Sequence, residues 1–151
     1  MQGFAISNLS NKNLKQKANK IVLDLFKTGI NVKYNIFGKF IYLESKDEIP
    51  RSYSEIKLYH AKLSTDKKED IFNSICNLID GKKKPANFAI RVNRKGEHKY
   101  SSTELAKEVA GAAFEEWPNV KVNLDKHSLE INIQIINNRS IIYLRNWWTL
   151  Q

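Results

Sequence analysis

The strongest constraint on the fold of this chain is the segment LEINIQI near its C-terminal end. Apolar residues alternate there with polar ones from Leu129 to Ile135. Successive side chains of a strand point to opposite faces, so the pattern predicts a strand with one buried and one polar face. The turn sequence INNRS and the segment SIIYLR follow. They predict a second strand that returns along the first over residues 140–145.

The segment FAIRVNRKGEHKYSSTELAKEV, residues 88–109, predicts a strand that leads into a helix. Its first residues alternate, so Arg91 and Asn93 are expected to face away from the core. Ser101 and Glu104 have the spacing of a capping box, which predicts that the helix begins just after Ser101.

An earlier helix is predicted over residues 66–80 from its buried stripe, and Asp66 and Glu69 again have capping-box spacing. Gly81 is a natural end for this helix. A basic linker to the following strand comes next and contains Lys82, Lys83 and Lys84.

The N-terminal part of the chain predicts a β-α-β-β order. A short strand over residues 3–7 is followed by a helix over 11–28, which Ser10 is placed to cap. An alternating segment from residue 30 to 36 then turns at Gly38, where glycine tolerates a positive φ. The segment KFIYLES is expected to return as its partner strand.

The best candidate boundary is the polar segment KDEIPRSY, which Pro50 interrupts. It predicts two domains, residues 1–50 and residues 53–146, although residues 53–64 fit neither a helix nor a strand pattern clearly. The fold class expected is α+β: a β-α-β-β half-domain followed by an α/β domain with a mixed sheet.

The chain carries a strong positive charge, with 25 Lys and Arg against 16 Asp and Glu, a formal net charge of +9. A basic globular protein attracts polyanions, nucleic acid first and anionic membranes second. The alternative is a lysine-rich surface that only maintains solubility.

Several classes of protein are disfavoured by what the sequence lacks. A single cysteine, Cys76, excludes an intramolecular disulfide and a thiolate zinc site and suits a reducing compartment. No segment resembles a signal peptide or approaches the roughly 18 apolar residues of a membrane span. We therefore expect a soluble, cytoplasmic protein without a membrane partner.

Catalytic patterns are absent as well. His60, His98 and His127 have no metal-ligand spacing, and Cys76 is expected to be a packed, inert thiol. The sequence contains no phosphate-binding loop, dinucleotide fingerprint or nucleophile elbow. We expect no enzymatic activity, no cofactor and no metal.

The basic residues are more informative, because four of the five arginines follow residue 81. The planar guanidinium matches phosphate geometry, and the predicted helix start at Ser101 adds a positive dipole end, partly offset by Glu104. We predict that these residues bind an anion, with an ordinary charged surface as the alternative. The candidate RNA-binding residues are Lys82, Lys83, Lys84, Arg91, Arg94, Lys95, His98, Lys99, Arg139 and Arg145.

Two adjacent tryptophans, Trp147 and Trp148, lie close to the C-terminal end. They are expected to pack on the sheet or in an interface, and stacking on unpaired bases is the alternative.

The second half of the chain resembles the THUMP domain. The resemblance rests on a strand with an outward arginine, a short basic loop, two serines before a helix that contains Gly111, a Val-x-Val-Asn-Leu strand and an alternating isoleucine strand. It covers about residues 53–145, and the β-α-β-β start resembles the ferredoxin-like domain that often precedes THUMP. Asn123 stands where the family usually has Asp, and His127 stands near a common Pro; both are expected to shape the turn.

The resemblance implies a tRNA-binding adaptor. In that family the module binds the acceptor end of tRNA and positions it for chemistry performed by another domain or protein. Only six residues follow Arg145, which leads us to expect a stand-alone accessory protein, closest to the one that assists tRNA cytidine acetylation. The alternative is a protein-interaction or RNA-binding subunit of a split tRNA methyltransferase or thiouridine synthase. A separate catalytic protein is the implied partner, and the oligomeric state stays open.

Overall fold

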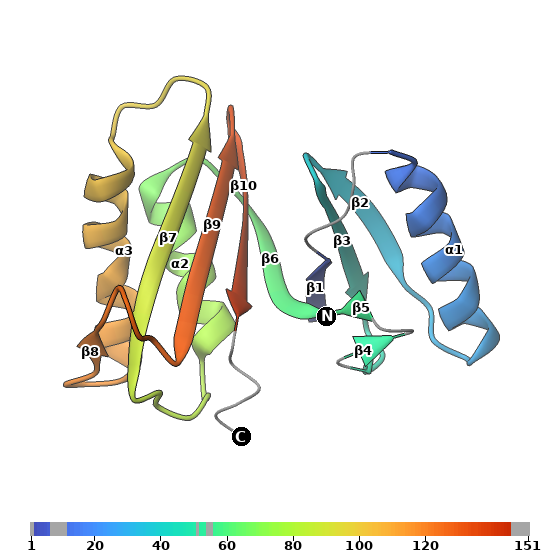
Figure 1. The fold of residues 1–151 in the computed structure, drawn as a ribbon, viewed down its shortest axis with the longest axis horizontal. Helices are drawn as coiled ribbons and strands as arrows, with labels where there is room; N and C mark the ends of the chain where they lie inside the picture. Colours follow the sequence, from blue (N-terminus) through green and yellow to red (C-terminus); the bar gives the residue numbers. More distant parts are fainter. Residues whose placement is uncertain (1, 7–11, 51, 54–55, 146–151) are drawn as a thin grey trace. The chain divides into compact units, whose positions relative to one another are not determined.

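The computed structural model describes residues 2–6, 12–50, 52–53 and 56–145 (Figure 1). The chain divides into two compact units, Met1–Ala61 and Lys62–Gln151. Strand β6 (Tyr59–Thr65) begins in the first unit and ends in the second. Within the described residues, no helix is long and apolar enough to cross a membrane.

The N-terminal unit has an antiparallel sheet with the strand order β2-β3-β1-β6. Its further elements are β1 (Gln2–Ile6), α1 (Leu14–Lys27), β2 (Lys33–Phe37), β3 (Phe40–Ser45) and the short pair β4 (Ser52–Tyr53) and β5 (Ile56–Lys57). The predicted β-α-β-β order is therefore confirmed.

Helix α1 packs an apolar stripe against this sheet, with Leu14, Ala18, Ile21 and Leu25 in one core with the strands. The helix starts later than expected, at Leu14, and Ser10 lies outside the described residues. Gly38 has φ +57° in the turn between β2 and β3, so its predicted role is confirmed.

The C-terminal unit has a mixed sheet with the strand order β6-β10-β9-β7-β8. Strand β7 pairs in parallel with β8 and β9, whereas β9 pairs antiparallel with β10. The elements are α2 (Lys68–Ile79), β7 (Asn87–Lys95), α3 (Ser102–Glu116), β8 (Lys121–Val122), β9 (Leu129–Ile136) and β10 (Arg139–Arg145). The α+β class with a mixed sheet is confirmed.

Helices α2 and α3 pack on one face of this sheet and on each other (Figure 1). The helices contact each other where α3 contains Gly111. A methyl group built on Gly111 would lie 3.2 Å from the ring of Phe72 on α2, so the glycine permits close helix packing. Burial of apolar surface is the main stabilisation of such a core, and it contributes roughly 25 cal/mol for each Å² removed from water.

The two predicted capping boxes have different outcomes. Ser101 is the N-cap of α3, and its hydroxyl accepts a hydrogen bond from the backbone N–H of Glu104 at 3.1 Å. The cap predicted at Asp66 is wrong, because Lys67 is the N-cap of α2. The Asp66 backbone is instead bonded to Asn138 and to the hydroxyl of Tyr100.

We predict that Gly96→Ala lowers the free energy of unfolding by about 2 kcal/mol or more, because two penalties combine there. Gly96 has φ +103°, and an added Cβ would lie 2.5 Å from Oδ1 and 3.2 Å from Cα of Asn137. Gly81→Ala is the matched control, since Gly81 has φ +71° with no atom within 4 Å of the added Cβ. It should cost about 1 kcal/mol, from backbone strain alone. Equal losses in urea unfolding would contradict this account.

Candidate nucleic-acid interface

The alternation of β7 assigns its side chains to two different faces of the sheet. Phe88 is buried in the core under the helices, with Ile90 and Val92 packed against it. Arg94 follows on the same side and contacts the start of α3. Arg91 and Lys95 are exposed on the opposite face. The predicted neighbours Arg91 and Arg94 therefore lie on opposite faces of one sheet.

Four of the predicted residues share the face that α2 and α3 leave uncovered. The strand register aligns Lys95, Ile136 and Arg139 in one cross-strand row. Two further rows place Arg91 and Arg145 on the same side. We define the sheet-face cations as Arg91, Lys95, Arg139 and Arg145. Between the rows of Lys95 and Arg91 the strand advances about 13 Å.

The sheet-face cations outnumber the acidic residues around them. On this face of β7, β9 and β10, all within the described residues, Glu130 is the one carboxylate. Tyr143 and Ile141 on the same face are buried, whereas Arg91, Lys95 and Arg139 are exposed. The charge accessible from solvent is therefore positive.

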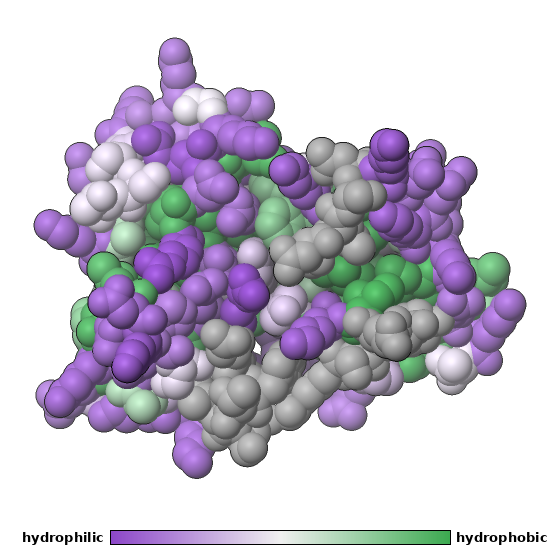
Figure 2. Space-filling view, in the orientation of Figure 1, coloured by the Kyte–Doolittle hydropathy of each residue, from purple (hydrophilic) through white to green (hydrophobic). Residues whose placement is uncertain are grey.

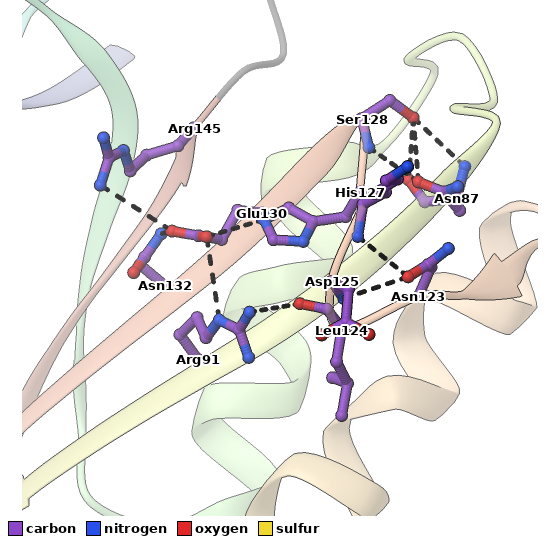
Figure 3. Close-up of polar contacts among 11 residues, drawn as sticks. Asn87, Arg91, Asn123, Leu124, Asp125, His127, Ser128, Glu130, Asn132 and Arg145 are labelled. Atoms are coloured by element: carbon purple, nitrogen blue, oxygen red, sulfur yellow. Dashed lines mark hydrogen bonds and ion pairs between the residues drawn. The ribbon is translucent and has the colours of Figure 1, made fainter.

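Glu130 lies between two of these arginines (Figure 3). Its Oε2 is 3.9 Å from Nε of Arg91, and its Oε1 is 4.0 Å from Nη1 of Arg145. The closest contacts of the carboxylate are with other groups: Nδ2 of Asn132 donates to Oε1 at 2.7 Å, and Nε2 of His127 lies 2.8 Å from Oε2. Arg91 also donates from Nη2 to the carbonyl oxygen of Leu124 at 2.6 Å.

The pKa of the Glu130 carboxyl is lowered from its ordinary value of 4.5. Burial alone would raise it, but hydrogen bonds from Asn132 and His127 and the positive charge of Arg145 outweigh the burial. The carboxylate is therefore ionised at neutral pH.

Arg94 and His98 build the loop between β7 and α3. Arg94 donates from Nε to the hydroxyl of Ser102 at 3.2 Å, and its Nη1 lies 3.2 Å from Nδ1 of His98. His98 Nε2 is 2.7 Å from the carbonyl oxygen of Asn137, and its ring stacks on Tyr100. Nε2 also lies 3.8 Å from Oδ2 of Asp66, and the His98 side chain is fully buried. His98 therefore belongs to the interior of this loop.

The linker lysines lie at the other end of β7, whose nine residues span roughly 27 Å. Burial lowers the pKa of Lys82, and its carbonyl accepts a hydrogen bond from the indole of Trp117 at 2.8 Å. Lys84 donates to the carbonyl oxygen of Pro118 at 3.0 Å, and Lys83 is exposed. The linker is therefore separate from Lys95 and Lys99 at the carboxyl end.

A recess of about 660 Å³ lies at the carboxyl end of β7, where α2 begins. Its charges nearly balance, and Lys68 is already bonded to Glu108 at 3.0 Å. The recess is therefore a weaker anion site than the sheet face. Figure 2 shows part of the polar surface of the sheet face. Its lining residues are Asp66, Lys67, Lys68, Glu97, His98, Lys99 and Tyr100.

The sequence did not identify Glu130 as the shared partner of two arginines. The available signal was the alternation, which placed Glu130 and Asn132 on the polar face. Asn123 was expected to shape the turn after β8, and the structure agrees. Its Oδ1 accepts hydrogen bonds from the backbone N–H groups of Asp125 and Lys126, both at 3.0 Å (Figure 3). The tryptophans Trp147 and Trp148 lie outside the described residues.

Residues 66–145, more than half of the chain, match the THUMP domain family. The chain belongs to the THUMP domain family. The match contains β7, β9, β10 and all four sheet-face cations. The THUMP domain here thus includes the arginine–glutamate group described above.

Three known proteins are similar to this chain. The tRNA sulfurtransferase of Vibrio campbellii is 32% identical over 89 residues, which cover 59% of this chain and 18% of that protein. The crystal structure of PH1313 from Pyrococcus horikoshii has a TM-score of 0.67 at 18% identity, over 96% of this chain and 54% of that one. A 4-thiouridine synthetase, in an RNA complex with bound ATP, has a TM-score of 0.66 at 12% identity, over 95% and 41%. The structural likeness supports the shared fold.

We expect Arg94→Gln to lower the free energy of unfolding by about 1–2 kcal/mol, because it removes two hydrogen bonds from the loop before α3. Lys95→Gln removes the same charge from an exposed neighbour and should change stability by less than about 0.5 kcal/mol. Chemical denaturation of both variants measures the difference. If the two losses were equal, the structural role of Arg94 would be wrong.

The lowered pKa of Glu130 predicts an acid-dependent loss of stability. A folded-state pKa below the unfolded value means that the ionised carboxylate stabilises the fold above that unfolded value, and the contribution disappears as the pH falls through the folded-state pKa. Wild-type protein should therefore lose more stability than Glu130→Gln between about pH 5 and pH 3. Parallel pH-dependent losses in denaturant titrations would contradict this prediction.

Proposed function

We propose that this chain is a tRNA-binding module that holds its RNA for chemistry performed by a separate polypeptide. The observation that carries the proposal is the single sheet face that carries Arg91, Lys95, Arg139 and Arg145, on which Glu130, held between Arg91 and Arg145, is the one carboxylate among the described residues of β7, β9 and β10. Cations arranged on one face neutralise successive phosphates, which supplies most of the affinity for a nucleic acid backbone.

The named relatives support the same proposal. One is called a tRNA sulfurtransferase, and another was solved as a 4-thiouridine synthetase in complex with RNA. Membership of the THUMP domain family and this naming favour tRNA over other polyanions. Binding to the acceptor end stays a prediction.

The catalytic partner is proposed in two versions. A cytidine acetyltransferase follows from the sequence resemblance. A thiouridine synthase is the alternative, and the names of the relatives favour it. This chain spans only 18% of the Vibrio relative, so the activity of such a whole protein is a proposal here.

We further propose that the chain itself is not an enzyme. Within the described residues, no three His, Cys, Asp or Glu side chains group as metal ligands. Cys76 would be the candidate nucleophile for sulfur chemistry, but burial and then the charge of Glu115 raise its pKa. The reactive thiolate is therefore disfavoured.

The test is the salt dependence of tRNA binding, measured with fluorescently labelled tRNA at increasing salt. We expect the logarithm of the association constant to fall linearly with the logarithm of salt concentration. The variant Lys95→Gln with Arg139→Gln should flatten that slope by about two units.

The matched control is Lys15→Gln with Lys27→Gln, two exposed lysines of α1 that carry the same total charge. Its slope should stay near that of the wild type. Failure of the wild-type protein to bind tRNA at low salt would refute the proposed function, and equal slopes for both double variants would refute this face as the interface.

A further inference from the structure

Arg91 and Arg145 come from strands on either side of β9 and approach the same carboxylate from two directions (Figure 3). Each lies within 4.0 Å of a different oxygen of Glu130. A shared anionic group therefore holds the two guanidinium groups near each other. A phosphodiester group also presents two anionic oxygens on one central atom.

The three side chains lie at different depths. The Glu130 side chain is 15% exposed, whereas those of Arg91 and Arg145 are 44% and 40% exposed. An anion that approaches from solvent meets the guanidinium groups before it meets the carboxylate.

The contacts between Glu130 and the arginines are longer than its contacts with Asn132 and His127. The 2.7 Å and 2.8 Å contacts keep the carboxylate on the sheet, and the arginine contacts at 3.9 Å and 4.0 Å lack the geometry of a bidentate pair. Arg91 is held as well by its hydrogen bond to the carbonyl oxygen of Leu124 at 2.6 Å, which fixes the direction of its guanidinium group.

The charges of Arg91, Arg145 and Glu130 do not cancel. Two guanidinium groups carry two positive charges, and the ionised carboxylate balances one of them. The remaining charge matches that of one phosphodiester. The carboxylate also reduces the repulsion between the arginines, which would otherwise drive the two side chains apart.

We propose that Arg91 and Arg145 jointly bind one backbone phosphate of an RNA strand, and that Glu130 is the positioning residue that holds both guanidinium groups for it. This proposal rests on the proposed function and adds one phosphate subsite to it. Glu130 does not touch the RNA in this arrangement.

A double-mutant cycle on RNA binding tests the shared phosphate, with Arg91→Gln, Arg145→Gln and the double variant. Each single variant should weaken tRNA binding about tenfold. The double variant should lose little more affinity for tRNA than a single variant. If the two contacts were independent, the double variant would lose about a hundredfold in affinity. The salt slope of the double variant should flatten by about one unit, not two.

The positioning role is tested by repeating the cycle in a Glu130→Gln background. Glutamine keeps the size of the side chain and removes its charge. The coupling between Arg91 and Arg145 should then vanish, so that the fold-losses of tRNA affinity from the two arginine substitutions multiply in the double variant. Circular dichroism and denaturation of every variant establish that each one is folded. Unchanged coupling in the Glu130→Gln background would refute the positioning role.

The outcomes separate this proposal from the function on which it rests. If wild-type protein binds tRNA with a steep salt dependence but the two arginine losses multiply, the shared phosphate is refuted and the tRNA-binding function stands. If the wild type binds inorganic phosphate and the double arginine variant does not, while both bind tRNA equally well, the subsite takes a free anion and the RNA assignment is refuted. If the wild type does not bind tRNA, both fail.

Discussion

The parallel pairing of β7 with β9 is the constraint on which the rest of the C-terminal unit depends. It aligns Ile90 with Ile131 on the helix side and Arg91 with Asn132 on the other. Parallel neighbours require a long crossover, and α3 supplies it while covering the apolar side. The antiparallel return of β10 then brings Arg145 opposite Glu130. A shift of one residue in either register would send these charged side chains into the core.

The two faces of this sheet have separate physical roles because the strands alternate so strictly. One face buries isoleucines, Phe88 and the apolar stripes of both helices. The other face carries the sheet-face cations, and among the described residues no helix of the same unit packs on it. The side chains that stabilise the core and those of the proposed interface are therefore different side chains of the same strands, and a surface arginine there can change without a cavity forming in the core.

Local patterns in the sequence predicted the local features of the fold. Alternation identified β7 and β9, the turn INNRS with the apolar segment after it identified β10, Ser101 identified the start of α3, and Gly38 identified the turn between β2 and β3. The cap at Asp66 failed because the Asp66 backbone is bonded to Asn138 and Tyr100, residues remote in sequence. The grouping of Arg91 with Arg94 failed for a different reason. The two arginines are three residues apart on one strand, so alternation places them on opposite faces of the sheet. The proximity of Arg145 to Arg91, by contrast, depends on the non-local register.

A carboxylate between two arginines would by itself repel a phosphate, but its position changes the balance. Two guanidinium groups on the strands that flank β9 repel each other, and the less exposed carboxylate of Glu130 between them offsets that repulsion. Guanidinium groups stay protonated at all physiological pH values, and the lowered pKa of Glu130 keeps the carboxylate ionised. The surplus of positive charge therefore persists near neutral pH. Salt at 0.1 M largely screens exposed charges that are more than about 10 Å apart. Ionic strength is therefore the variable expected to control the attraction of this face for phosphate.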